Sequence, residues 1–524
     1  MTDGERRDPM QEELVASALL GTGRRPGGPG AEAVLDAAAV HAVRRRAGLR
    51  AGAPVTLPEP APYDERAPLP GAARRRLAQL LAGRAAPAPA GGRRGAAPDV
   101  AELLPQWLAA AGRYGYRAPA SALPALLDAA RARTDLRPAA LAFAGPRGLW
   151  LARQNPEWRF ALRGAAGGAA LPPVGDHGAV RRLWDEGLFA ERVALLAAVR
   201  AADPAAGREL LAATWAAERA EDRLMFLDSL RAGLSDADEE FLETALTDRS
   251  RNVRSTAAEL LSALPASALA ARMADRATSC VALDRSGDGG PGVFVEAPHE
   301  CDAAMQRDGL VCTPPPGRGE RSWWLGQLVE YAPLSCWQDR LGGRTPAEIV
   351  ALPVADDWQP ELHAAWSRAA VRQRDAAWSR ALLGSPSTSS LAERAKLLAT
   401  LEEDERAEWV ADFVSAHGLS EAFQLLGVCA VPWAEPLGRA VVDALDIARD
   451  AGSYPWSFSG VMGLAERCLD PGAAGRLEAL TTLVAEGEDA APGAAGYWSE
   501  AFQRLVSTLR LRGAMHEELV PHPR

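Results

Sequence analysis

Four residues with the chemistry of metal ligands lie close together in the middle of the chain. The segment between positions 280 and 312 contains Cys280, His299, Cys301 and Cys312. Thiolate and imidazole groups are ligands that Zn²⁺ prefers. No two of these cysteines form a C-x-x-C pair, however, and buried thiols without a metal explain the same residues. They are therefore weak metal candidates, and we expect no cofactor.

Other catalytic patterns are weaker still. The glycine-rich run 21–30 lacks the lysine of a phosphate loop, and Pro26 and Pro29 remove backbone amides that would bind phosphate. The carboxylates of Asp356 and Asp357 stand where a helix is expected to begin, which explains them without acid–base catalysis. The seven histidines are scattered, so they define no serine or cysteine nucleophile with its base. We lean towards a protein that is not an enzyme.

A mixture of arginine and tryptophan follows the cysteine segment. The stretch "PPPGRGERSWW" ends in Trp323 and Trp324 and carries Arg318 and Arg321. Arginine and tryptophan are enriched where proteins bind one another, so these four residues are our candidates for a partner-binding surface. Ion pairs packed under a tryptophan are the structural alternative, and the sequence leaves it open.

The charge balance argues against broad nucleic-acid binding. The 524 residues carry a formal net charge of −10, whereas phosphate recognition needs clustered cations. The runs of three arginines at 44–46 and 74–76 are the only hint of a basic stripe, and solvated helix faces explain them. Lys396 is the only lysine, so any lysine-dependent site would have to use it.

The location expected from the sequence is the cytoplasm. The N-terminal stretch is charged and has no apolar signal core, and nothing approaches the length of a membrane-spanning segment. Six cysteines in so long a chain, without a signal sequence, favour free thiols in a reducing compartment.

The elements that would position these residues are mostly α-helices. Alanine, leucine and arginine dominate, and helical periodicity is clearest over 179–280. Ser235 and Asp238 have the spacing of a helix capping box. Gly21 is expected to end a helix over 11–20, and the Asn155-Pro156 pair to end another.

One helical unit has a more specific pattern. Residues 236–265 resemble a HEAT repeat, in which the second helix begins with Asp, then Val-Arg, then small and apolar residues. Asp248, Val253 and Arg254 match this pattern, and the resemblance implies that Asp248 and Arg254 bridge adjacent repeats. One such unit cannot bury its own apolar face, so neighbouring units are expected. The predicted fold is mostly α, a HEAT-like α-solenoid.

A small irregular insert with short strands interrupts the helices. Val293, Phe294 and Val295 are typical of a strand. We expect four parts: N-terminal helices with Pro/Gly-rich linkers (1–98), a helical domain with HEAT-like repeats (99–280), the insert (281–345) and a C-terminal helical domain (346–524).

Several stretches together resemble an uncharacterised family of bacterial proteins designated only as a domain of unknown function. They are "LVASALLGTGRRP" (14–26), "WLARQNPEW" (150–158), the HEAT-like unit, "MQRDGL" (305–310) and "RDAAWSRALL" (374–383). Members are often encoded beside a MoxR-type AAA ATPase, a von Willebrand A-domain protein and a SWIM zinc-finger protein. The resemblance implies these proteins as partners and supplies no catalytic residues.

Two classes of function follow from these observations. The first is a non-enzymatic helical-repeat scaffold or adaptor that presents an extended surface to protein partners. The alternative is an enzyme or metal-binding protein with its site in the insert, 280–345. Nucleic-acid binding is a third, less favoured interpretation.

Overall fold

The computed structural model describes most of the chain. The described residues are 9–21, 30–47, 58–83, 100–164, 171–172, 174–285, 290–388, 390–482 and 493–521. The chain divides into two compact units, Met1–Pro62 and Tyr63–Arg524. The division into four parts expected from the sequence stays a prediction.

The first unit contains two helices that contact each other, α1 (Pro9–Leu20) and α2 (Ala31–Arg46). Gly21 follows α1 with a φ of 75°, a left-handed conformation that glycine adopts easily, so the predicted helix end is confirmed. Most of the predicted linker segments, including 84–98, lie outside the described residues.

The second unit begins with helices that share one apolar core. They are α3 (Gly71–Gly83), α4 (Val100–Arg113), α5 (Leu123–Ala132), α6 (Arg137–Gln154) and α7 (Arg159–Gly164). α6 ends at Gln154 because Asn155 precedes proline and is held in an extended conformation, as the sequence predicts. The core of this segment also contains Met515 and Leu519, from the other end of the unit.

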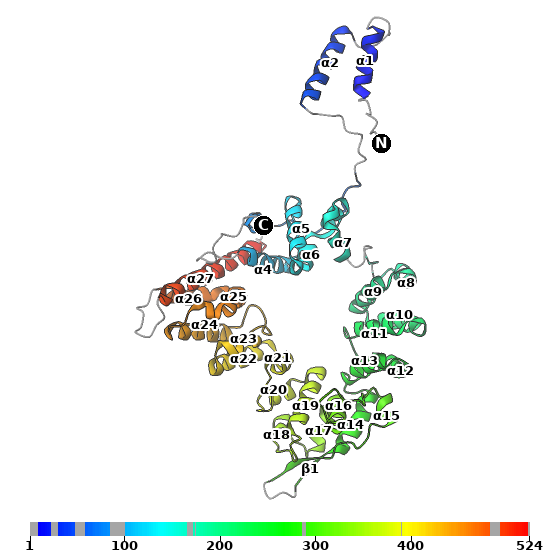
Figure 1. The fold of residues 1–524 in the computed structure, drawn as a ribbon, viewed down its shortest axis with the longest axis vertical. Helices are drawn as coiled ribbons and strands as arrows, with labels where there is room; N and C mark the ends of the chain where they lie inside the picture. The colour runs from blue at the N-terminus through cyan, green and yellow to red at the C-terminus, as the bar shows by residue number, and fades with distance from the viewer. Residues whose placement is uncertain are drawn as a thin grey trace. The chain divides into compact units, whose positions relative to one another are not determined.

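The next helices pack in order along the chain (Figure 1). They are α8 (His177–Glu186), α9 (Phe189–Ala202), α10 (Pro204–Thr214), α11 (Ala220–Ser229), α12 (Glu239–Ala245), α13 (Arg251–Ser262) and α14 (Ala268–Cys280). α9, α11 and α13 contact one another in sequence, whereas α10 packs on α9 and α12 packs on α13. The apolar stripe of α13 is fully buried at Val253, Ala257 and Leu261.

Two short strands follow α14. β1 (Val281–Asp284) and β2 (Gly292–Val295) are antiparallel, with Val281 opposite Val295 and Asp284 opposite Gly292. The predicted strand at 293–295 is therefore confirmed. The amide of Val293 donates to the Pro353 carbonyl at 2.8 Å, which ties the strand pair to the helices that follow.

A second and larger apolar core contains residues of α8 to α14 and of the helices that follow the strands. These later helices are α15 (Ala303–Arg307), α16 (Glu320–Tyr331), α17 (Ser335–Arg340), α18 (Pro346–Val350), α19 (Gln359–Gln373), α20 (Ala376–Leu383), α21 (Leu391–Leu398), α22 (Glu403–His417), α23 (Leu419–Leu426), α24 (Glu435–Asp450), α25 (Ser459–Cys468), α26 (Ala474–Glu478) and α27 (Ala494–Leu519). Trp366 and Trp378 are buried against each other, with ring centroids 5.3 Å apart.

The long helix α27 belongs to both cores. Leu505 and Leu509 pack in the larger core, whereas Met515 and Leu519 pack in the core of α3 to α7. The hydroxyl of Tyr116 donates to the Leu519 carbonyl at 3.0 Å. The mostly helical class and the two short strands are confirmed. No described helix has both the length and the apolarity needed to cross a membrane.

Candidate functional site

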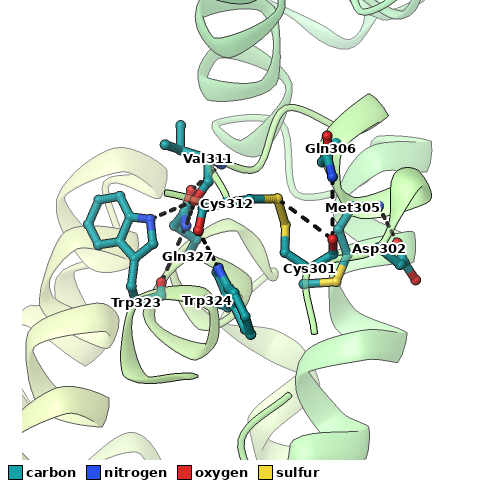
Figure 2. The surroundings of a disulfide bond; sticks show 9 residues. All are labelled: Cys301, Asp302, Met305, Gln306, Val311, Cys312, Trp323, Trp324 and Gln327. Atoms are coloured by element: carbon teal, nitrogen blue, oxygen red, sulfur yellow. Dashed lines mark hydrogen bonds between the residues drawn. A yellow bond between two sulfur atoms is a disulfide. The ribbon is translucent and has the colours of Figure 1, made fainter. Parts of the chain in front are cut away.

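The two tryptophans predicted to bind a partner make hydrogen bonds inside the molecule. Trp323 and Trp324 lie in the first half of α16, and Figure 2 shows both indoles directed at the segment 311–312. The Trp323 indole N–H donates to the Val311 carbonyl at 2.6 Å, and that of Trp324 donates to the Cys312 carbonyl at 2.8 Å. Trp324 is only 7% exposed. Both side chains therefore hold the 311–312 segment against α16.

The two arginines of this surface differ in how far the molecule already uses them. Arg321 donates to the backbone carbonyls of Ala297 and Pro298, so it holds the segment after β2 against α16. Arg318 is also exposed; its guanidinium lies over the Trp323 ring at 6.0 Å and 4.0 Å from the Glu361 carboxylate. Partner binding by these four residues stays a prediction, and Arg318 is the member with the most freedom to meet a partner.

A disulfide between Cys301 and Cys312 corrects the expectation of free thiols at these two positions. Gly309, with a φ of 93°, turns the chain back after α15, which brings Cys312 beside Cys301 at a Cα–Cα distance of 5.6 Å. The Gln327 side chain holds the segment around Val311 in place, because it accepts from the Val311 amide and donates to the Val311 carbonyl (Figure 2). The sequence alone could not show this turn.

The weak metal candidates are not brought together as ligands. Cys301 and Cys312 are bonded to each other, so neither offers a thiolate to a metal. Cys280 is buried, and burial raises the pKa of its thiol. His299 is exposed beside Glu296. Among the described residues, no group of three or more histidine, cysteine or acidic side chains is placed to hold a metal ion.

The two charged HEAT-like residues make different kinds of contact. Asp248 forms an ion pair with Arg223 of α11 at 2.7 Å and also accepts from the Ser250 amide. Arg254 donates to the Asp248 and Arg249 carbonyls just before its own helix. Asp248 therefore connects the start of α13 to α11, and the bridging of adjacent repeats that the resemblance implies stays a prediction.

A concave surface lies elsewhere, along α13, α16, α19 and α21. This groove has a volume of about 1170 Å³. Its apolar lining includes the half-buried Leu234 and Val371, whereas Leu260 and Leu264 at its base are buried. Around them stand charged side chains: Arg231, Glu259, Glu330, Arg368, Arg372, Arg374, Glu393 and Lys396. We refer to this surface as the charged groove.

Part of this charge is neutralised inside the groove. Glu330, whose side chain is only 13% exposed, lies between Arg368 and Arg372 and pairs with both. Arg231 pairs with Glu259 at 3.0 Å and with Asp228 at 2.7 Å. Hydrogen bonds to these carboxylates raise the pKa of Arg231 above its ordinary value, so it stays charged. These pairs give the groove a fixed frame.

Two cations of the charged groove remain without such pairing. Arg374 and Lys396 are both exposed, and neither has a hydrogen bond or ion pair from its side chain to the described part of the chain. Arg374 ends α19 in the left-handed region, with φ 54° and ψ 42°. A residue other than glycine is rare and costly in that conformation. Such backbone outliers concentrate at functional sites.

Sequence reasoning missed the charged groove, although part of its signal was present. Arg368 and Arg372 are four residues apart, so a helix places them on one face. Lys396 was already singled out as the only lysine. What the sequence could not show is that α16 brings Glu330 between the two arginines, or that α13 and α21 complete the walls.

These features define a mostly helical protein whose helices frame a groove of mixed charge. The chain belongs to the Family of unknown function (DUF5691), whose sequence profile matches residues 13–519. No curated protein and no solved structure matches the chain.

Proposed function

We propose that this chain is a non-enzymatic, HEAT-like helical-repeat scaffold that holds a segment of a protein partner in the charged groove. The observation that carries the proposal is a pair of exposed cations, Arg374 and Lys396, that have no ion pair among the described residues. They line the groove together with the half-buried apolar side chains of Leu234 and Val371. A combination of apolar contact and oriented charge is what protein recognition uses.

The packing of the helices supports a scaffold. α9, α11 and α13 contact one another in sequence, and α16 packs on α14 and α19. Stacked helices present long, stable surfaces, because each helix is held by its neighbours on both sides. The groove walls therefore need little rearrangement to receive a partner. Partners of the MoxR-type ATPase, von Willebrand A-domain and SWIM zinc-finger classes are part of this proposal. A cytoplasmic location is also part of it, and the Cys301–Cys312 disulfide is then an exception to the reduced thiols usual in that compartment.

Site-specific photo-crosslinking in the native host tests the proposal. A photoreactive amino acid replaces Ala392, which is exposed in the groove lining, and in a control strain it replaces Ala190, which is exposed on α9. We expect one protein to be captured in high yield at position 392 and not at position 190. Metal content is measured on the same purified samples.

The outcomes separate clearly. The same set of proteins at both positions, or no adduct at position 392 while the protein purifies alone, would overturn the proposed function. One stoichiometric metal ion in the lone protein would instead favour the metal-binding alternative. Adducts confined to position 392 would identify the partner and support the scaffold.

A further inference from the structure

We infer that the charged groove recognises an acidic segment of a partner protein that also carries aliphatic side chains, and that Arg374 and Lys396 select its carboxylates. This inference rests on the proposed function and deepens it, because it names the chemistry of the partner. It is carried by the charge, the backbone and the lining of the groove.

The charge of the groove is opposite to that of the whole chain. Five basic and three acidic side chains line it, so the lining has a net charge of +2, whereas the chain carries −10. Three of the cations are held by Glu330, Glu259 and Asp228. The cations left without an ion pair among the described residues are Arg374 and Lys396, and they outnumber the one carboxylate of the lining that is likewise left, Glu393. Arg374 and Lys396 face solvent and attract an anionic group.

The backbone at Arg374 provides an independent observation. The amide of Arg374 donates to the Ala370 carbonyl, which ends α19 in a left-handed turn. Glycine would occupy this position with less strain, and it is the usual residue there. The side chain of Arg374 makes no hydrogen bond or ion pair within the described residues that would offset the strain. A role in binding explains why an arginine stands there.

The lining favours a peptide over a nucleic acid. Among the described residues that line the groove none is aromatic, so bases would find no ring on which to stack. The half-buried side chains of Leu234 and Val371 instead suit leucine, isoleucine or valine of a bound segment.

A random peptide library displayed on phage provides an unbiased test. The full-length wild-type protein is the bait, and binders to the Arg374→Glu/Lys396→Glu double variant are removed beforehand. We expect enriched peptides to combine Asp or Glu with Leu, Ile or Val. Peptides of basic, neutral or aromatic composition, or no enrichment at all, would overturn the inference.

Affinity measurements with one enriched peptide then test the two cations. We expect the double variant to bind at least tenfold more weakly and NaCl to weaken binding to the wild type. The matched control is Arg182→Glu/Arg476→Glu, which reverses the same charge at two exposed arginines outside the groove and is expected to stay within twofold. Equal losses in both double variants would show a general effect of charge and sink the inference. Circular dichroism confirms that each variant is folded.

The single lysine locates the bound peptide. A carbodiimide joins a carboxylate to an amine without a spacer, and Lys396 is the only lysine in the chain. An N-acetylated acidic peptide should therefore be joined to Lys396, and mass spectrometry of the digest shows the site. Joining only to the N-terminal amine would contradict the placement.

Two further outcomes keep this inference distinct from the proposed function. A single-stranded RNA oligonucleotide that binds through Arg374 and Lys396 more tightly than any peptide would replace the inference with nucleic-acid recognition. A partner captured at position 392 in cells, together with library binders that lack acidic residues, would leave the scaffold standing and remove the inference. Failure of both experiments would remove both.

Discussion

Arg200 and Asp238 form an ion pair at 3.1 Å in which both side chains are completely buried. Arg200 also donates to the carbonyls of Leu230, Ala232 and Gly233, so the loop after α11 wraps around one guanidinium. Asp238 in addition accepts from the Ser235 amide, which confirms the carboxylate half of the predicted capping box. One carboxylate thus joins α9 to the start of α12.

Removal of this carboxylate should be strongly destabilising. Asp238→Ala leaves the buried charge of Arg200 without its partner, which costs about 3–5 kcal/mol. Hydrogen exchange of α9 to α12, followed by mass spectrometry, should become at least a hundredfold faster. The control is Asp185→Ala, which breaks the exposed pair with Arg181 and should cost no more than about 0.5 kcal/mol. Similar exchange in both variants would contradict the prediction.

His363 should make the stability of the second unit depend on pH. Burial lowers the pKa of its imidazole from 6.5 to about 4 in the folded chain. Between pH 6.5 and pH 4, the His363 imidazole is therefore mostly protonated in the unfolded chain and mostly neutral in the folded chain. The free energy of unfolding consequently falls as the pH falls. The expected loss between pH 6.5 and pH 5 is about 2 kcal/mol.

His363→Gln isolates this contribution. Trp366, 5.7 Å from the His363 ring, is one of 15 tryptophans, so tryptophan fluorescence during urea denaturation follows unfolding of the chain as a whole. The wild type should lose more of its urea midpoint between pH 7 and pH 5 than the variant does. Parallel losses in the two proteins would show that other groups control the acid sensitivity.

The disulfide should separate the cysteines into two classes. The chain has six cysteines, of which Cys301 and Cys312 are bonded and four are free. Alkylation of the denatured protein should add four adducts before reduction and six afterwards. Cys301→Ala/Cys312→Ala should destabilise the insert by about 2–4 kcal/mol, because the disulfide limits the unfolded chain. Six adducts without reduction would disprove the bond.

Arg374→Gly should separate stability from binding. Glycine relieves the left-handed conformation at φ 54°, so we expect the variant to be as stable as the wild type or more stable, by up to about 1 kcal/mol. Binding of the selected acidic peptide should nevertheless weaken severalfold, since a cation of the charged groove is lost. Calorimetry and fluorescence anisotropy measure the two quantities. A variant that loses stability would mean that the Arg374 side chain has a structural role.

The sequence predicts what neighbouring residues determine. Asn155-Pro156 ends α6 and Gly21 follows α1, because both effects act within a single turn of backbone. The β-branched and aromatic residues at 293–295 identify β2 for the same reason. The helical class follows from periodicity, which needs no knowledge of partners.

Contacts between distant segments were not predictable in the same way. Asp238 has the pattern of a capping residue, and nothing near it shows that Arg200, in another helix, reaches it. Asp248 stands out in the HEAT-like pattern, but the sequence does not show that its ion-pair partner is Arg223 of α11. The side chains of the charged groove come from several helices that are distant in the sequence. Which of them lie together can therefore be seen only in the packed structure.

The two cores joined by α27 have a consequence for synthesis of the protein. Met515 and Leu519 fill the core of α3 to α7, and Glu518 pairs with Arg76 at 2.7 Å. A ribosome makes residues 71–164 long before residue 515, so this core cannot close as it is translated. Until residues 515–519 have been synthesised, α3 to α7 therefore expose the apolar surface that Met515 and Leu519 later cover. Chaperone demand should therefore be concentrated on the nascent N-terminal half.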